Sequence, residues 1–153
     1  DAIGWAAILS QLLAALGSLF AKAGIGKIVS DIVASAIPTD SALAVVIAYC
    51  LGMAVFTIIM GNAFAAFAVI TSGIGIPLVI VAHGANPLIV APIAMLAGYC
   101  GTLMTPMAAN FNIVPAALLE MQSKYGVIRA QIPLAISLLA ANILLMYFLG
   151  FHS

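Results

Sequence analysis

The sequence is short of charge. Asp, Glu, Lys and Arg make up 5% of its 153 residues, they balance to a formal net charge of zero, and none of them occurs from Ser41 to Leu119. Hydrophobic residues make up 66% of the chain. Because a domain dissolved in water needs polar groups to cover its surface, this composition excludes a soluble domain and indicates a membrane protein in contact with the lipid bilayer.

The sequence also lacks a basic stripe and any cluster of metal-ligating residues. Nucleic-acid binding requires concentrated positive charge, so we expect no nucleic-acid partner. Cys50 and Cys100 have no neighbours at the spacing of a zinc site and are interpreted as packing residues. An intramembrane enzyme needs a nucleophile with a base, or a metal triad, and the central block offers only these cysteines and His83. We therefore expect no enzymatic activity and no cofactor, apart from Na⁺ as a coupling ion.

The sequence does contain long runs of apolar residues. About 20 residues cross a bilayer as a helix, and the interruptions between the apolar runs predict an all-α, polytopic membrane protein. We expect four segments. They are a span followed by an interfacial amphipathic helix (1–37), a pair of apolar helices (42–82), a helix broken at 105–112 (88–124) and a last span (130–151).

Two of these segments are interrupted. Gly61 and Asn62 divide 42–82, which is either two full spans or a re-entrant hairpin with its tip at 61–62. A Gly-Asn tip between small and aromatic residues is a poor loop for water, so we favour the hairpin. Thr105-Pro106 breaks 88–124, because proline removes an amide donor and disfavours helical geometry in the residue before it. We expect the helix to resume at about Ile113.

The candidate site has to be built from neutral groups. Each interruption presents the N–H groups of a new helix start, which attract an anion, and freed carbonyl groups at the preceding helix end, which can coordinate a cation. Asn and Thr side chains add amide and hydroxyl groups. The candidate substrate-binding residues are Gly61, Asn62, Thr102, Thr105, Asn110 and Asn112. This set predicts a site for a small carboxylate, with Na⁺ near Asn62 and Asn110.

The same polar residues have a structural interpretation. Asn and Thr in membrane helices often hydrogen-bond only to a neighbouring helix, which is what we expect of Asn142 in the last span. The chain would then be a non-transporting assembly subunit, in which Asn62→Ala and Asn110→Ala lower stability without a selective loss of substrate binding. A channel component is a further alternative, because backbone carbonyls can form an ion filter.

Two runs of the chain carry a resemblance to a known family. They are FTIIMGNAFAAF (56–67) and CGTLMTPMAANFNIVP (100–115). They resemble the C-terminal half of the larger subunit of a two-part bacterial 5-oxoproline (pyroglutamate) transporter family, long known as a domain of unknown function. The resemblance covers essentially all of the chain. It implies a multi-pass protein of the bacterial inner (plasma) membrane, an N-terminal half missing from this chain, a smaller membrane partner subunit, and 5-oxoproline as the substrate.

The order of hairpin tip, internal helix, Pro-Asn break and last span is more distantly similar to the ion transporter superfamily of the Na⁺/dicarboxylate symporters. There, a Ser-Asn-Thr motif at each hairpin tip contacts the substrate carboxylate and Na⁺, and an elevator-like movement carries the site across the membrane. The tip here, Gly61-Asn62-Ala63, keeps only the Asn of that motif. This resemblance implies one inverted-repeat half of an elevator-type transporter, with Asn62 and residues 105–112 in a site at the interface between repeats.

Overall fold

The structure, a computed structural model, describes residues 37–151 continuously, together with residues 15, 19, 22–24, 27–28, 31–32 and 35. The predicted first span lies outside the described residues, as does most of the predicted interfacial helix. The described helices are α3 (Ala42–Met60), α4 (Ala63–Ile70), the π-helix η1 (Thr71–Ala82), α5 (Pro87–Met104), α6 (Ala109–Leu118) and α7 (Gly126–Gly150). No β-strand occurs among these residues.

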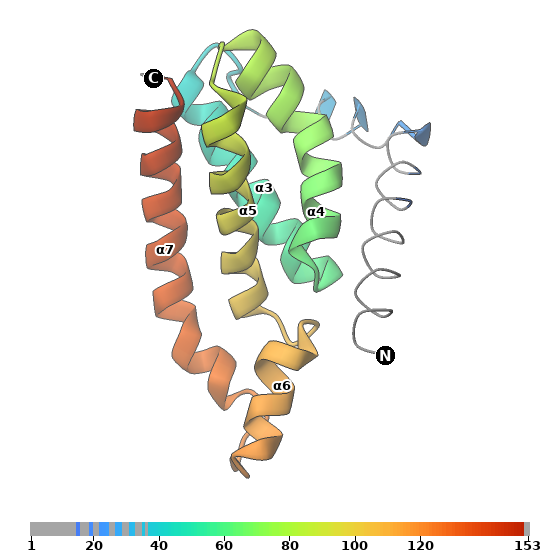
Figure 1. The fold of residues 1–153 in the computed structure, drawn as a ribbon, viewed down its shortest axis with the longest axis vertical. Helices are drawn as coiled ribbons and strands as arrows, with labels where there is room; N and C mark the ends of the chain where they lie inside the picture. The colour runs from blue at the N-terminus through green and yellow to red at the C-terminus, as the bar shows by residue number, and fades with distance from the viewer. Residues whose placement is uncertain are drawn as a thin grey trace.

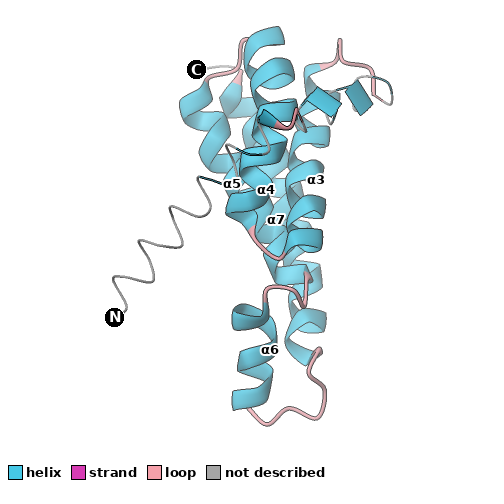
Figure 2. Ribbon diagram, turned by 90° about the vertical axis from the view of Figure 1, so that its right-hand side faces the viewer, coloured by secondary structure: helices cyan, strands magenta, loops and turns pink. Residues whose placement is uncertain are grey.

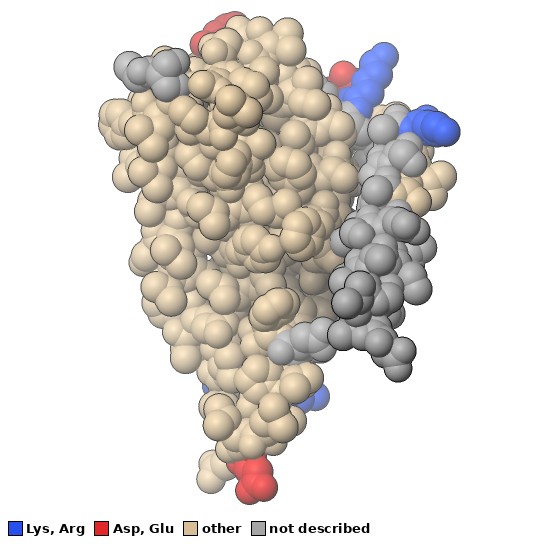
Figure 3. Space-filling model, viewed as in Figure 1, with Lys and Arg blue, Asp and Glu red and all other residues tan. Residues whose placement is uncertain are grey.

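Within the described residues, four helices are long and apolar enough to cross a membrane. They are α3 with 19 residues, α4 continued by η1 with 20, α5 with 18 and α7 with 25. On the face shown in Figure 3, the charged side chains lie toward the two ends of the molecule and an uncharged surface lies between them. For the described residues, the prediction of an all-α protein with helices long and apolar enough to span a membrane is therefore confirmed.

Local chemistry explains where these helices begin and end. The Ser41 hydroxyl caps α3 by accepting a hydrogen bond from the Ala44 N–H at 3.4 Å. α3 ends at Gly61, whose φ of +70° is the left-handed conformation that glycine adopts without steric cost. α5 begins with Pro87 in its first turn, and the Asn86 side chain accepts from the Leu88 N–H at 3.0 Å.

Helix α5 packs against both α3 and α7, and the core lies between these helices and η1 (Figure 1). Small residues allow the closest approaches. Gly101 of α5 lies against the backbone of Ala54 in α3, and the Tyr49 ring of α3 lies over Gly75 of η1. The Tyr49 hydroxyl also shares a 2.8 Å hydrogen bond with the Thr71 hydroxyl, which joins α3 to the start of η1.

The close contact at Gly101 predicts that a single methyl group added there destabilises the protein. A Cβ at this position would meet the Ala54 carbonyl oxygen and would lie 2.9 Å from Cβ of Thr57. A helix backbone cannot move aside as a side-chain end can, so Gly101→Ala should lower the free energy of unfolding by about 1–3 kcal/mol. Denaturant unfolding in detergent measures this loss.

Gly52→Ala is the matched control, because its Cβ would meet side-chain methyl groups and no backbone, with Cγ2 of Ile70 at 3.3 Å and Cδ1 of Ile74 at 3.5 Å. Those side chains can shift, so the control should lose less than about 1 kcal/mol. Equal losses in the two variants would contradict the close backbone contact between α3 and α5.

One end of the bundle is tied together by loops. His83 Nε2 lies 2.8 Å from the Thr39 carbonyl oxygen, and the Asn86 N–H donates to the Gly150 carbonyl at 2.9 Å. From this end α3 and α5 run for 19 and 18 residues, whereas α7 has 25. The end of α3 and the end of α5 therefore lie side by side, and α6 continues beyond them, as Figures 1 and 2 show.

Candidate functional site

The hairpin tip, Gly61 and Asn62, joins α3 to α4. The Gly61 N–H donates to the Thr57 carbonyl at 2.7 Å and so completes the last turn of α3. The Asn62 side-chain oxygen accepts from the N–H groups of Phe64 at 2.9 Å and Ala65 at 3.3 Å. Asn62 is thus the N-cap of α4. Two of the N–H groups that we expected to face an anion are already bonded, and the Asn62 amide NH₂ makes no hydrogen bond to the described residues.

The break between α5 and α6 comprises residues 105–108. Thr105 is extended, with φ −118° and ψ 137°, as the residue before a proline prefers. Its hydroxyl donates to the Ile58 carbonyl at 2.8 Å and accepts from the Met107 N–H at 3.1 Å. Thr105 therefore satisfies a carbonyl group freed at the end of α3 and holds the break in a tight turn.

The break is shorter than the predicted interval 105–112, because α6 begins at Ala109 and not at about Ile113. Asn112 lies fully buried in the first turns of α6, where its Nδ2 donates to the Thr102 carbonyl at 2.8 Å and to the Thr105 carbonyl at 2.6 Å. Its side chain caps the end of α5 from within the next helix. The sequence does not reveal this bond, because a helix end is ordinarily capped by residues adjacent to it in the chain.

The tip and the break touch. A Cβ added at Gly61 would lie 2.8 Å from Cβ of Met107 and 2.9 Å from its carbonyl oxygen, so the glycine backbone rests directly on the break. Together with the bond from Thr105 to Ile58, this contact brings Gly61, Thr105, Asn112 and Thr102 into one region. Met107 and the Ile58 carbonyl also belong to it. The sequence gives no signal for either, because Met107 acts through its backbone and Ile58 through a carbonyl group.

Two buried oxygens in this region have no hydrogen-bond partner: Oγ1 of Thr102 and Oδ1 of Asn112. Thr102 is 6% exposed and Asn112 is not exposed. An unpaired buried polar group costs about 1–3 kcal/mol. Both oxygens are of a kind that can accept a hydrogen bond or coordinate a cation, and neither has a partner among the described residues.

The N-terminus of α6 borders the same region. Its N-cap is Ala108, whose methyl side chain cannot accept a hydrogen bond. The α4 start is capped by Asn62, whereas the α6 start has no side-chain cap from its own N-cap residue. The side chain of Asn110 lies outside the described part of the structure, so its predicted role stays a prediction.

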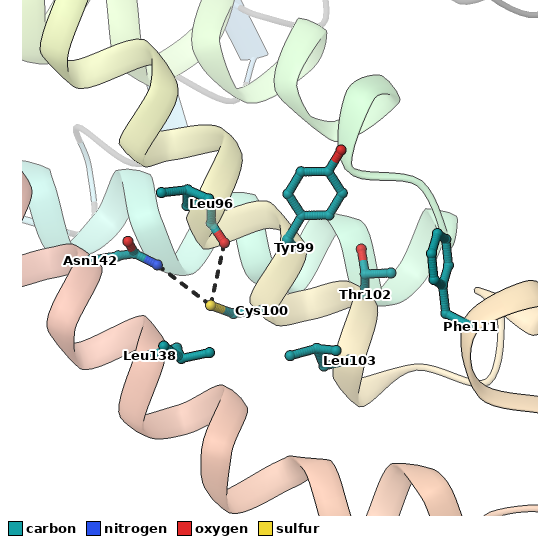
Figure 4. A pocket seen from close by; sticks show the side chains of 8 residues that line it. All are labelled: Leu96, Tyr99, Cys100, Thr102, Leu103, Phe111, Leu138 and Asn142. Atoms are coloured by element: carbon teal, nitrogen blue, oxygen red, sulfur yellow. Dashed lines mark hydrogen bonds between the residues drawn. The ribbon is translucent and has the colours of Figure 1, made fainter. Parts of the chain in front are cut away.

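A cavity of about 320 Å³ lies among α5, α6 and α7 (Figure 4). Its lining residues are Leu96, Tyr99, Cys100, Thr102, Leu103, Phe111, Leu138 and Asn142. Of the candidate site residues, the cavity includes Thr102. Asn142 lies across the helix interface and donates to Sγ of Cys100 at 3.6 Å, which confirms the prediction that it bonds a neighbouring helix.

Comparison with known proteins gives a family and no activity. The family model described as "Protein of unknown function (DUF979)" matches residues 1–151. No curated protein and no solved structure matches the chain. The function therefore has to be argued from the tip, the break and the groups around them.

Proposed function

The chain belongs to the DUF979 family, and we propose that it forms half of a secondary transporter that binds a small carboxylate where the hairpin tip meets the break. The observation that carries the proposal is the contact of two helix interruptions inside an uncharged block, with buried polar atoms left unpaired beside it. Non-helical backbone at membrane depth is tolerated only where protein or a water-filled cavity surrounds it, and such breaks form binding sites in transporters.

The carboxylate would be bound by the start of α6 and the free amide NH₂ of Asn62. A helix N-terminus carries about half a positive charge and exposed N–H donors, which suit an anion. Na⁺ as the coupling ion would be bound by neutral oxygens, for which the unpaired Asn112 Oδ1 and Thr102 Oγ1 are suitable. 5-Oxoproline is proposed as the substrate because residues 56–67 and 100–115 resemble that transporter family.

We also propose that α3 and α4 form a re-entrant hairpin. α7 has 25 residues against 19 in α3, so beside a common end it extends about 9 Å further at 1.5 Å per residue. The tip would then stop short of the membrane surface that α7 reaches. The same proposal includes an inverted-repeat N-terminal half, a smaller partner subunit, an elevator-like movement and a location in the bacterial inner membrane.

Uptake of labelled 5-oxoproline tests the site through Asn62→Ser. Serine retains an oxygen that can cap α4 but lacks the amide NH₂, so stability should stay within about 1 kcal/mol of wild type. If the NH₂ binds the substrate, uptake at matched expression should fall at least about tenfold, the effect of losing one hydrogen bond to a charged group. The assay uses cells that carry the full-length protein and its partner, with and without Na⁺.

Asn86→Ser is the matched control, because Asn86 caps α5 by the same kind of bond and lies at the opposite end of that helix. It should leave uptake unchanged. Normal uptake by Asn62→Ser would reduce Asn62 to a helix cap and favour an assembly subunit. Flux that neither saturates nor depends on an ion would favour a channel component.

A further inference from the structure

Tyr99 of α5 lies beside the start of α4. Its ring makes an edge contact with the ring of Phe64, with the centroids 6.2 Å apart and the planes at 87°. Phe64 is also the residue whose N–H donates to the Asn62 side-chain oxygen at 2.9 Å. In Figure 4 the Tyr99 hydroxyl points away from Cys100, toward the pale green ribbon that leads into α4. Tyr99 thus brings a hydroxyl to the helix start that Asn62 caps.

The Tyr99 hydroxyl has no partner among the described residues. By contrast, the Tyr49 hydroxyl in the same bundle pairs with that of Thr71 at 2.8 Å. Tyr99 is 39% exposed and lies about 18 Å along α5 from Pro87, at 1.5 Å per residue. Because the hydrocarbon layer of a bilayer is about 30 Å thick, the hydroxyl lies inside this layer and not in the interface that tyrosine prefers. A polar group at that depth needs a partner.

A carboxylate at the tip needs several hydrogen-bond donors. It can accept about four hydrogen bonds, and no Lys or Arg occurs from Ser41 to Leu119 to neutralise it. Phe111 in the first turn of α6 and Tyr99 line the same cavity, so Tyr99 adjoins the start of α6 as well as the start of α4. A hydroxyl that donates to a carboxylate makes a short, charge-assisted hydrogen bond. Tyr99 is therefore suited to be a donor for this anion.

We propose that Tyr99 is a substrate-binding residue, whose hydroxyl donates a hydrogen bond to the carboxylate beside the amide NH₂ of Asn62. This inference rests on the proposed function and adds to it a donor from α5. It predicts that the site prefers a carboxylate to the corresponding primary amide, because the NH₂ of an amide cannot accept a hydrogen bond.

Equilibrium binding of labelled 5-oxoproline to the purified full-length protein with its partner, in lipid nanodiscs, tests this role. Tyr99→Phe keeps the ring that packs against Phe64 and removes only the hydroxyl. Its Kd should rise at least about tenfold, the effect of one lost hydrogen bond to a charged group. The unfolding temperature of the ligand-free protein should not fall, since the hydroxyl bonds to no protein group.

Tyr147→Phe is the matched control. Tyr147 also packs against a neighbouring ring, that of Phe148 at 5.5 Å, and it lies close to Gly150 at the tied end of the bundle, away from the tip. This variant should leave the Kd unchanged.

The neutral analogue 5-oxoprolinamide separates recognition of the carboxylate from a general disturbance of the site. Its Kd is measured by displacement of labelled 5-oxoproline. Wild type should bind the acid more tightly than the amide, and Tyr99→Phe should lose most of this preference. A purely structural effect of the substitution would weaken both ligands equally.

Three outcomes would overturn the inference and leave the proposed function standing. They are an unchanged Kd for the acid in Tyr99→Phe, equal weakening of the acid and the amide, and a lower unfolding temperature of the ligand-free variant. The last would assign the hydroxyl to a protein partner outside the described residues. Failure of the wild-type protein to bind 5-oxoproline would refute the proposed function, and the inference with it.

Discussion

Gly61→Ala is expected to abolish uptake and to lower the free energy of unfolding by roughly 2–5 kcal/mol. Two effects add at this position. An alanine at φ +70° is strained in the left-handed region, and its Cβ would lie within 2.9 Å of the Met107 backbone. The tip and the break would have to separate, which would disrupt the region proposed to bind the carboxylate. Thermal unfolding of the purified protein and uptake at matched expression measure the two effects.

Gly84→Ala separates the strain from the contact. Gly84 has nearly the same φ, +69°, but a Cβ there would meet nothing within 4 Å. This control should lose only about 1–2 kcal/mol and retain uptake. If Gly61→Ala lost no more than Gly84→Ala, the contact between tip and break would not contribute to stability.

Asn112→Leu is expected to cost about 2–5 kcal/mol, because it leaves two carbonyl groups at the end of α5 without their donor. Leucine has the same branched shape and the same number of side-chain heavy atoms, so no cavity opens, and the loss combines the missing hydrogen bonds with the larger volume of two methyl groups. Uptake should be lost with it, since the break would no longer be fixed against α5. Chemical denaturation in detergent measures the stability, and uptake is compared at equal amounts of folded protein.

The control for this change is Asn142→Leu. Asn142 is also buried, at 7% exposure, but its bond is a weaker one to the Cys100 sulfur at 3.6 Å. It should cost less than about 1.5 kcal/mol. A larger loss in Asn142→Leu than in Asn112→Leu would contradict the capping role assigned to Asn112.

The helix boundaries that the sequence predicts best depend on local chemistry. α3 begins after Ser41, whose side chain caps it, and ends at Gly61, whose backbone is free to adopt the left-handed conformation. α5 ends before Pro106, because proline lacks an N–H. The restart of α6 was predicted at about Ile113 and occurs at Ala109. Asn-rich sequence suggested loop, but Asn112 is accommodated in a helix because its side chain bonds to α5.

The candidate site was predictable as a set of residue types and not as a set of contacts. Their polar groups make Thr102, Thr105 and Asn112 candidates, and in the structure the side chain of Asn112 in α6 meets the other two at the end of α5. The contacts depend on how two distant segments of the chain pack together. This packing brings Thr105 to Ile58 and Gly61 to Met107. The cavity was not predicted either, because its residues come from three helices and most of them are apolar.

The bonds of Thr105 and Asn112 have a mechanical consequence. Thr105 fastens the end of α5 to α3, and Asn112 fastens the start of α6 to the end of α5. A displacement of α6 is thus transmitted to α3 through these side chains, and we expect the three helix ends to move together as one rigid unit. Every residue from 119 to 125 is exposed, so the compliant element of this half of the molecule is the connection between α6 and α7.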